Sequence, residues 1–415
     1  MPKPHFAIVG ASAAGISAAL AMRTSGFEGI ITLLDKDPRI PYERPPLSKK
    51  FDDMAVLKPI VAESTFVDND IDLGLGETVT AMDPATGTVC TDERTIRADR
   101  VLLATGLSAI TIDVPGAALD GVMTLRDADD AFELSQRLAK GGRLTVLGGG
   151  FIGLELAAVA STLGMDVTVV ELSATPLGAL NPTVGGLLRE RHEEMGVRFR
   201  CGVAVTSFEG DGAVRRVVLA DGSRIDADVV VVGIGARPRY VPTGENGISL
   251  DSGIVVDHHG VTSNPSVFAA GDIANRPHRS TGRRGRIEHW DVALRHGAAV
   301  GASMAGVPTE DVEIPYAWSD QYDNTLQMYG RPTAGDRFVL RSDATPSTFI
   351  AFWIRSGSIS SAIAYGMPRD VRVAKALIEQ STPVSEAELA DSANSLRDIM
   401  KGARKMKEVH GGDSE

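Results

Sequence analysis

The chain has 415 residues, 43% of them hydrophobic, and a formal net charge of −12. This length predicts two or three domains, because a single core rarely grows beyond about 250–300 residues. The negative charge argues against general binding to nucleic acids or to anionic membranes. No secretory segment precedes the first strand, and no window reaches the roughly 18 uncharged apolar residues of a membrane span. We therefore expect a soluble cytoplasmic protein.

The first predicted strand, residues 6–9, ends in a glycine-rich turn that an Ala-rich helix follows. Such a turn lets the backbone approach a pyrophosphate, whose charge lies at the amino end of the helix. An aspartate ends the next apolar strand, where a carboxylate either binds a ribose 2′-hydroxyl or only caps the strand. A serine replaces the middle glycine, which weakens this motif taken alone. The residues of this first predicted dinucleotide site are Gly10, Ser12, Ala13, Ala14, Gly15, Asp35 and Lys36.

A second glycine-rich turn follows the apolar strand 144–147, and another Ala-rich helix follows the turn. The next strand, 167–170, ends in Glu171, with no arginine directly after it, which favours NAD over NADP because a carboxylate repels a 2′-phosphate. Two such turns, each with an acid downstream, predict two dinucleotides and electron transfer between them. The residues of the second predicted site are Gly148, Gly150, Phe151, Ile152, Gly153, Glu155 and Glu171.

The order of the elements predicts nested domains. Residues 108–236 repeat the plan of the first segment, with a helix near 184–195 and a final apolar strand at 229–232. A further buried strand then ends in Gly271 and Asp272, and a helix follows from about residue 289 to 305. From residue 315 aromatic residues lie on short alternating strands, and a polar helical tail begins near 384.

The two cysteines, Cys90 and Cys201, form no CxxC or CxxxxC pair. Electron transfer through a vicinal dithiol needs such a pair. We therefore interpret both as structural thiols.

Five further stretches are more specific. They are Pro41-Tyr42-Glu43-Arg44-Pro45-Pro46-Leu47-Ser48-Lys49, Ala104-Thr105-Gly106, Ala270-Gly271-Asp272, Glu288-His289-Trp290 and Trp318-Ser319-Asp320-Gln321-Tyr322-Asp323. With them the chain resembles, along essentially its whole length, the NADH-dependent, FAD-containing reductases of two-iron ferredoxins, a putidaredoxin reductase-like family. The resemblance implies an α/β fold with two Rossmann-like dinucleotide-binding domains, similar to glutathione reductase, and a C-terminal α+β domain. The FAD-binding domain would be 1–107 and 237–313, the NAD-binding domain 108–236, and the C-terminal domain 314–415.

The resemblance also assigns roles to single residues. It places Lys49 beside the reactive flavin nitrogen, paired with Glu155, where a cation stabilises negative charge on reduced flavin. It implies that Asp272 binds the ribityl chain, that Trp290 lies near the flavin ring, and that Trp318 opens the strand covering it. For both tryptophans a purely structural core role remains open. The other cofactor-binding residues that it implies are Arg44, Pro45, Val79, Ala104, Thr105, Gly106, Arg126, Gly235, Gly271, Glu288, His289 and Ala293.

The implied activity is that of a ferredoxin–NAD(+) reductase. A hydride passes from NADH to FAD, and single electrons then reach a [2Fe-2S] ferredoxin that feeds an oxygenase. The alternatives are a rubredoxin reductase, an NADH oxidase, or an NADH-responsive flavoprotein that acts through partner binding. One departure from the family concerns the loop after Glu171, which lacks the usual phosphate-binding arginine. Either the affinity for NADH is modest, or Arg189 or Arg191 substitutes.

A run of basic residues follows the Gly271-Asp272 pair and contains no acid. In an acidic protein such a run predicts a docking surface for an acidic ferredoxin, or else a solvated loop whose arginines are paired inside the fold. Its arginines are Arg276, Arg279, Arg283, Arg284 and Arg286.

Overall fold

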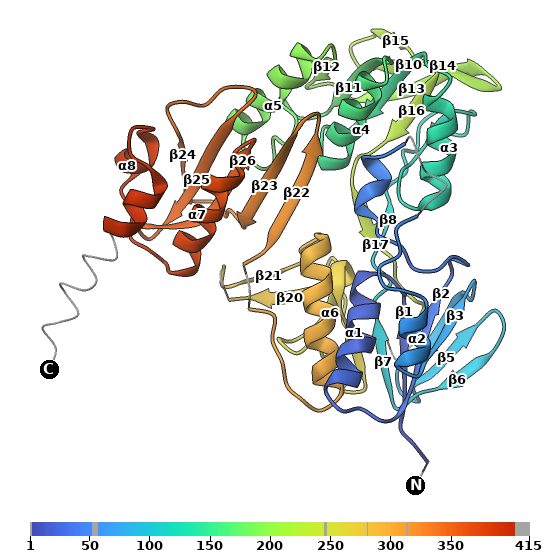
Figure 1. Ribbon diagram of the computed structural model, residues 1–415. Coiled ribbons are helices and arrows are strands. Elements are labelled where there is room, and N and C mark those ends of the chain that lie inside the picture. Colours follow the sequence, from blue (N-terminus) through green and yellow to red (C-terminus); the bar gives the residue numbers. More distant parts are fainter. Residues whose placement is uncertain (1, 52–56, 245–246, 280, 313, 403–415) are drawn as a thin grey trace, which may run out of the picture. The chain divides into compact units, whose positions relative to one another are not determined.

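The computed structural model describes residues 2–51, 57–244, 247–279, 281–312 and 314–402. The chain forms two compact units, and both are discontinuous in sequence (Figure 1). Unit 1 comprises residues 1–45, 56–108 and 236–315, and unit 2 comprises residues 46–55, 109–235 and 316–415. The three-domain boundaries expected from the sequence remain a prediction.

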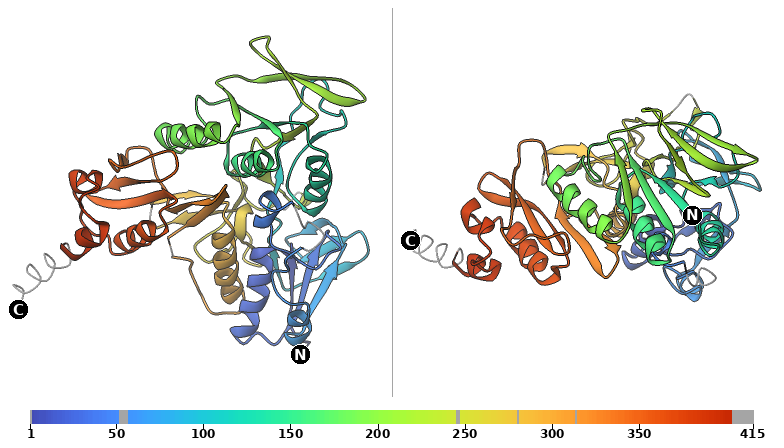
Figure 2. Two further views of the ribbon diagram at one scale, coloured as in Figure 1. Left: turned by 45° about the horizontal axis from the view of Figure 1, so that its top comes forward. Right: turned by 90° about the horizontal axis from the view of Figure 1, so that it is seen from above.

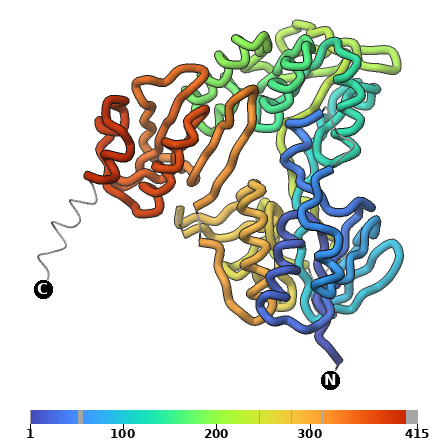
Figure 3. The backbone as a smooth tube through the Cα atoms, in the orientation of Figure 1, coloured from blue at the N-terminus to red at the C-terminus, as the bar shows by residue number. Residues whose placement is uncertain are grey.

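The main sheet of unit 1 has five parallel strands in the order β19-β7-β1-β2-β3. Its strands are β1 (His5–Val9), β2 (Ile30–Asp35), β3 (Ile71–Leu75), β7 (Arg100–Leu103) and β19 (Val267–Ala269). The central strands are almost continuously apolar because both faces of the sheet are covered. The tube in Figure 3 shows the blue helix of residues 13–24 and the yellow-orange helix of residues 290–304 side by side in this unit.

Two helices, α1 (Ala13–Thr24) and α6 (Trp290–Met304), pack on each other against one face of this sheet (Figure 1). The other face packs against the antiparallel sheet β4 (Val79–Asp83), β5 (Thr88–Thr91) and β6 (Thr95–Arg97). The remaining elements of unit 1 are α2 (Ser64–Asp68), β8 (Leu107–Ala109), β17 (Ala236–Pro238), β18 (Ile254–Val255), η3 (Gly271–Ile273), β20 (Ala274–His278) and β21 (Arg283–Gly285).

Unit 2 repeats this plan. Its parallel sheet has the order β12-β11-β10-β16-β9, and β10 lies between β11 and β16 as β1 lies between β2 and β7. The strands are β9 (Val122–Met123), β10 (Arg143–Leu147), β11 (Asp166–Glu171), β12 (Arg198–Cys201) and β16 (Val229–Val232). The flanking elements are α3 (Ala128–Leu138), α4 (Phe151–Thr162), α5 (Pro182–Glu194), β13 (Val205–Asp211), β14 (Ala213–Leu219) and β15 (Arg224–Asp226).

The last part of unit 2 is an antiparallel sheet in the order β22-β23-β26-β25-β24, drawn in orange to red in Figure 2. Its strands are β22 (Tyr316–Gln321), β23 (Asn324–Gly330), β24 (Arg337–Leu340), β25 (Phe349–Arg355) and β26 (Ser358–Tyr365). The helix α7 (Pro368–Glu379), which the sequence analysis did not anticipate, packs on this sheet together with α8 (Glu386–Ala390). The expected fold class, two Rossmann-like domains and a C-terminal α+β domain, is confirmed.

Candidate functional site

The two glycine-rich turns have the same geometry. In each, the first glycine has a positive φ, +109° at Gly10 and +101° at Gly148. Each also lies against the backbone of a neighbouring strand end, since a Cβ on Gly10 would lie 2.4 Å from the carbonyl oxygen of Ala104 and one on Gly148 2.4 Å from that of Gly233. Only glycine fits both the conformation and the close approach.

The last glycine of each turn packs the helix onto the turn. A Cβ on Gly15 would lie 1.9 Å from the oxygen of Gly10, and one on Gly153 2.0 Å from that of Gly148. The middle position differs, because Ser12 has φ −108° and Gly150 has φ −78°, both open to any residue. Ser12 therefore introduces no strain, and the departure from the glycine motif leaves the turn intact.

Each acid at the end of the second strand closes its own turn. Asp35 accepts hydrogen bonds from the amides of Ala11 (2.7 Å) and Asp37 (2.9 Å). Glu171 accepts them from the amides of Gly149 and Ser173, both at 2.7 Å. Strand capping and ribose binding are compatible here, because a carboxylate has about four acceptor positions and two are used. Both carboxylates lie at the carboxyl edge of the sheet, the edge at which sheets of this kind bind ligands.

Two other segments of unit 1 reach the same carboxyl edge as the first turn. Ala104, Thr105 and Gly106 follow β7, and the hydroxyl of Thr105 donates to the oxygen of Arg239. The Gly271–Asp272 turn follows β19, the neighbour of β7. Gly271 has φ +74° and touches α1, since a Cβ there would lie 2.8 Å from the Cβ of Ala14. The sheet order thus brings together three segments that are far apart in sequence.

In unit 2 the predicted pair of Lys49 and Glu155 is present. The Nζ of Lys49 lies 2.9 Å from Oε2 of Glu155, and the Glu155 side chain, on the first turns of α4, is 4% exposed. The hydroxyl of Ser48 donates to the same carboxylate oxygen. A buried carboxylate is stable as an ion only when it is paired and hydrogen-bonded. Ser48 belongs to the motif of residues 41–49, but the sequence predicted no role for it, because its partner lies 107 positions away.

The remaining predicted residues lie as follows. Trp290 begins α6 and packs against the core of unit 1, Ala293 is buried one turn later, and His289 is the N-cap of this helix. Glu288 is ion-paired with Arg286 at 2.7 Å, and Val79 begins β4. In unit 2, the ring of Trp318 stacks on Tyr316 with centroids 5.8 Å apart. Gly235, with φ +113°, follows the strand β16.

The other predicted residues lie at or near the ends of helices and strands. Lys36 directly follows β2, Arg44 precedes the 3-10 helix η1 (Pro45–Ser48), and Phe151 and Ile152 begin α4. The amide of Arg126 donates to Asp130 at 2.7 Å.

Arg189 remains the candidate for the missing phosphate-binding arginine. Its side chain is 38% exposed and paired with Glu193 on the same helix. Arg191 is instead held at the β22–β23 turn, where it pairs with Asp323 and lies over the ring of Tyr322. The half-buried Cys201 lies near both Arg189 and Glu171, and burial raises the pKa of its thiol. Arg191 therefore has a structural partner that the sequence did not reveal.

Four of the five arginines in the basic run after Asp272 have partners within the fold, two of them acids from another segment. Arg276 is buried, 8% exposed, and pairs at 2.7 Å with the buried Asp311. It cannot belong to an exposed docking surface, which corrects the sequence-based expectation for this residue. Arg279 pairs with Glu310, and Arg284 donates to the backbone oxygens of Val256 and Asn275. These acids lie some thirty residues downstream, so local sequence could not reveal them. Arg286 pairs with Glu288, and Arg283 is exposed on β21.

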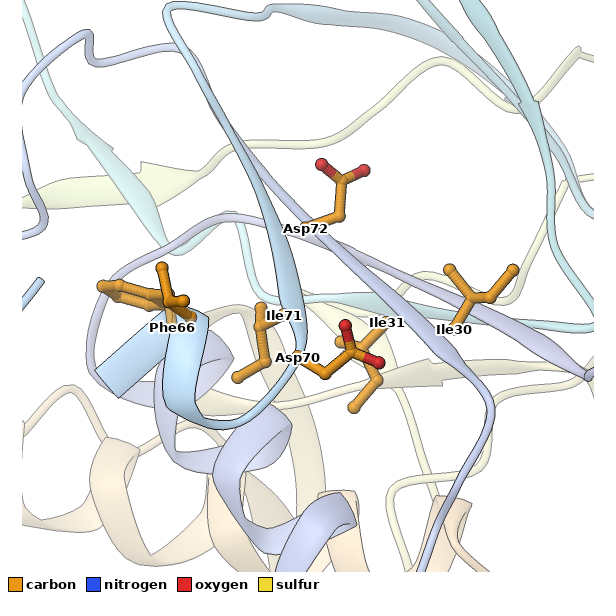
Figure 4. Close-up of a pocket in the computed structure, with 7 residues that line it drawn as sticks. Ile30, Ile31, Phe66, Asp70, Ile71 and Asp72 are labelled. Atoms are coloured by element: carbon orange, nitrogen blue, oxygen red, sulfur yellow. The ribbon is translucent and has the colours of Figure 1, made fainter. Parts of the chain in front are cut away.

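A surface pocket of about 230 Å³ lies elsewhere on unit 1 (Figure 4). Its lining residues are Ile30, Ile31, Phe66, Val67, Asp70, Ile71 and Asp72. Ile30 begins β2, so the pocket lies at the amino edge of the sheet, whereas sheets of this kind bind ligands at the carboxyl edge. The pocket is therefore separate from the glycine-rich turns, which lie at the carboxyl edge.

Neither a membrane-spanning helix nor a metal site is found in the described part of the chain. No helix there is long and apolar enough to cross a bilayer. Within the same residues no three His, Cys, Asp or Glu side chains are grouped to hold a metal ion. Cys90 and Cys201 are both unpaired.

Comparison with known proteins places this geometry in context. Residues 4–297 match the family described as pyridine nucleotide-disulphide oxidoreductase, and residues 316–400 match the one described as reductase C-terminal. The ferredoxin reductase component of chlorobenzene dioxygenase from Cupriavidus sp. (strain PS12) is 37% identical over 406 residues, 96% of this chain and 98% of that protein.

The chain is also similar to a rubredoxin reductase and to a putidaredoxin reductase of known structure. A rubredoxin–NAD(+) reductase from Pseudomonas putida is 35% identical over 339 residues, 80% of this chain and 88% of that protein. The crystal structure of the covalent putidaredoxin reductase–putidaredoxin complex superimposes with a TM-score of 0.92 at 30% identity, covering 97% of this chain and 100% of that chain.

Proposed function

The chain belongs to the pyridine nucleotide-disulphide oxidoreductase family, and from this premise we propose that it acts as a ferredoxin–NAD(+) reductase. Family membership confirms the resemblance seen in the motifs, the oxidoreductase class, and FAD and NAD(H) as the cofactors. The observation that carries the proposal is the repeated turn, closed by Asp35 in one unit and by Glu171 in the other. One chain with two such sites can hold an electron donor and an electron carrier.

The residues fit these cofactors. Each turn presents a helix amino end to a pyrophosphate. The backbone around the first and last glycines of each turn is so close that it leaves no room for a Cβ. We assign FAD to the site of Asp35, Ala104–Gly106 and Asp272, and NADH to the site of Glu171. When bound, FAD accepts a hydride from NADH and passes electrons on singly. On this assignment residues 1–107 and 237–313 form the FAD-binding domain, 108–236 the NAD-binding domain, and 314–415 the C-terminal domain.

The chain's own residues supply orientation and electrostatics. Glu155 holds the ammonium of Lys49 at 2.9 Å, and a cation fixed in this way stabilises negative charge as it develops on a neighbouring group. The Ser48 hydroxyl fixes the same carboxylate oxygen. The two unpaired cysteines lie on separate strands, β5 and β12, which supports direct transfer to an external acceptor.

The proposed acceptor is a [2Fe-2S] ferredoxin in the cytoplasm that serves an oxygenase. The relatives support this, since one is a ferredoxin reductase component of a dioxygenase and another was crystallised with putidaredoxin. The rubredoxin reductase match supports rubredoxin as the second candidate acceptor.

The test is to compare acceptors for the purified holoenzyme. NADH oxidation is measured with a [2Fe-2S] ferredoxin, with a rubredoxin, with oxygen alone, and with ferredoxin plus cytochrome c. Fast cytochrome c reduction that requires ferredoxin supports the proposal. Equal rates with oxygen alone indicate an oxidase, and a long-lived flavin–NAD charge-transfer band without turnover indicates a signalling flavoprotein.

A further inference from the structure

His296 is a buried histidine of unit 1 that has no role in the proposed function. It lies on α6, its side chain is 2% exposed, and its Nδ1 accepts a hydrogen bond from the amide of Gly271 at 3.2 Å. Its Nε2 is buried and has no hydrogen-bond partner among the residues that the structure describes. Buried polar groups are nearly always paired, so a histidine kept at such a position requires an explanation.

The imidazole of His296 is neutral in this arrangement. Because Nδ1 accepts the Gly271 amide, it carries no proton, and the proton is on Nε2. Burial, together with the nearby cations Arg276, His278 and Arg295, holds the pKa of His296 well below its usual value. The ring therefore acts as a fixed acceptor.

The acceptor holds the turn assigned to the cofactor. Gly271 is buried with φ +74°, and Asp272 follows it directly. A buried amide left without an acceptor destabilises the fold, because the water that solvated it is not replaced by another partner. The hydrogen bond from Gly271 therefore ties the carboxyl end of β19 to helix α6.

The residue after His296 fixes α6 against the first glycine-rich turn. A Cβ on Gly297 would lie 2.2 Å from the oxygen of Ala14, and one on Gly301 2.3 Å from that of Ala18. The backbones of α1 and α6 are thus in direct contact, as their adjacent positions in Figure 1 show. Ala14 belongs to the first turn of α1, which begins just after the glycine-rich loop.

We propose that His296 is a positioning residue for FAD, because it sets the Gly271–Asp272 turn in register with the glycine-rich turn of α1. His296 and Gly297 are consecutive, so one turn of α6 contacts both cofactor-binding segments. The inference rests on the proposed FAD site. It predicts that an acceptor at the position of Nδ1, and not merely a side chain that fills the space, is needed for tight flavin binding.

Two amide substitutions distinguish an acceptor at the position of Nδ1 from an acceptor placed elsewhere in the same space. In His296→Asn the side-chain oxygen falls near the place of Nδ1, whereas in His296→Gln it reaches toward Nε2. His296→Leu fills the space with no acceptor. His192→Leu, at a fully buried histidine of unit 2, is the matched control for loss of a buried imidazole.

The measurement is the FAD dissociation constant of each holoprotein, followed by the rise in flavin fluorescence on release, together with the melting temperature. We expect His296→Leu and His296→Gln to weaken FAD binding at least about tenfold, and His296→Asn to stay within about threefold of the parent. His192→Leu should retain parental FAD affinity even if it melts earlier.

Parental affinity in His296→Leu, or equal losses in His296→Asn and His296→Gln, overturns the inference. If His296→Leu does not fold, the comparison of the two amides decides. A parent protein that binds no FAD contradicts the proposed function itself, and this outcome is distinct from the others.

Discussion

The hydroxyl of Tyr322 donates a hydrogen bond to Nδ1 of the buried His192 at 2.8 Å. The other ring nitrogen of His192 lies 3.1 Å from Oε1 of Gln321, whose amide nitrogen donates to Ser319. His192 lies in the last turn of α5, the helix that follows the Glu171 loop. The other three residues belong to the β22–β23 hairpin, which also carries Trp318. A continuous polar network therefore ties the proposed NADH-binding segment to the C-terminal sheet within unit 2.

This network holds a strained residue. Tyr322 has φ +56°, a conformation rare for a bulky side chain, at a tight hairpin turn. Burial raises its pKa, so the hydroxyl keeps its proton as the donor to His192. Strained residues persist only where their surroundings fix them.

Replacing Tyr322 with Phe removes only this donor. We expect a loss of about 1–2 kcal/mol in stability, because Nδ1 of His192 is left buried without a partner. Thermal unfolding measures it. Tyr316→Phe is the matched control, since that hydroxyl accepts from Gln327 inside the same hairpin at 2.8 Å. Equal melting temperatures for Tyr322→Phe and the parent would contradict the role of the hydroxyl.

Acid should weaken the same network. Burial lowers the pKa of His192 from 6.5 to about 4, so between these values the unfolded chain binds more protons than the folded one. Stability is then fully present above about pH 6.5 and is lost as the pH falls toward 4. The melting temperature of the parent should drop more between pH 7 and pH 5 than that of His192→Asn. Parallel pH profiles would show that His192 is not the group that titrates.

Glu171→Arg should shift nucleotide preference. The change removes the acceptor for the 2′-hydroxyl and for the Gly149 amide, and a guanidinium binds a 2′-phosphate. We expect kcat/KM for NADH to fall at least about tenfold and that for NADPH to rise. Steady-state kinetics with ferricyanide measures both. A parent that uses NADPH as well as NADH would rule out the assigned role of Glu171.

Ser48→Ala should slow flavin reduction by NADH about tenfold, because the Glu155 carboxylate that holds Lys49 loses one hydrogen bond. Stopped-flow flavin absorbance gives the limiting rate and the NADH dissociation constant separately. Ser48→Thr keeps the hydroxyl and should recover most of the rate. A purely structural Ser48 would instead lower the melting temperature with the limiting rate unchanged.

Arg283→Glu tests what remains of the predicted docking surface. Arg283 is exposed on β21, and Arg215→Glu on β14 is the control for charge reversal on unit 2. We expect Arg283→Glu to raise the KM for ferredoxin severalfold at low salt, and less at high salt, with NADH–ferricyanide turnover unchanged. The same KM in both variants across a salt titration would place the docking surface elsewhere.

The sequence by itself determined the two dinucleotide-binding units, because their signals are local. A tight turn requires glycine at Gly10 and Gly148, a carboxylate follows at a nearly fixed distance, and the strands between are continuously apolar. The pair of Lys49 and Glu155 was reached only through the family resemblance, since no local spacing links residues on separate segments.

The tertiary structure decided which polar groups find each other. Asp311 forms an ion pair with Arg276, and Ser48 donates a hydrogen bond to Glu155. Tyr322 donates a hydrogen bond to His192, and His296 accepts one from the amide of Gly271. Helix α7 was missed although its sequence carries a helical signal, since Pro368 stands at the first helical position and Val371, Ala374 and Leu377 recur at helical spacing. Each of the four polar contacts joins residues more than twenty positions apart. The energy of these contacts depends on desolvation and geometry that only the folded chain creates. Composition and periodicity therefore could not predict them.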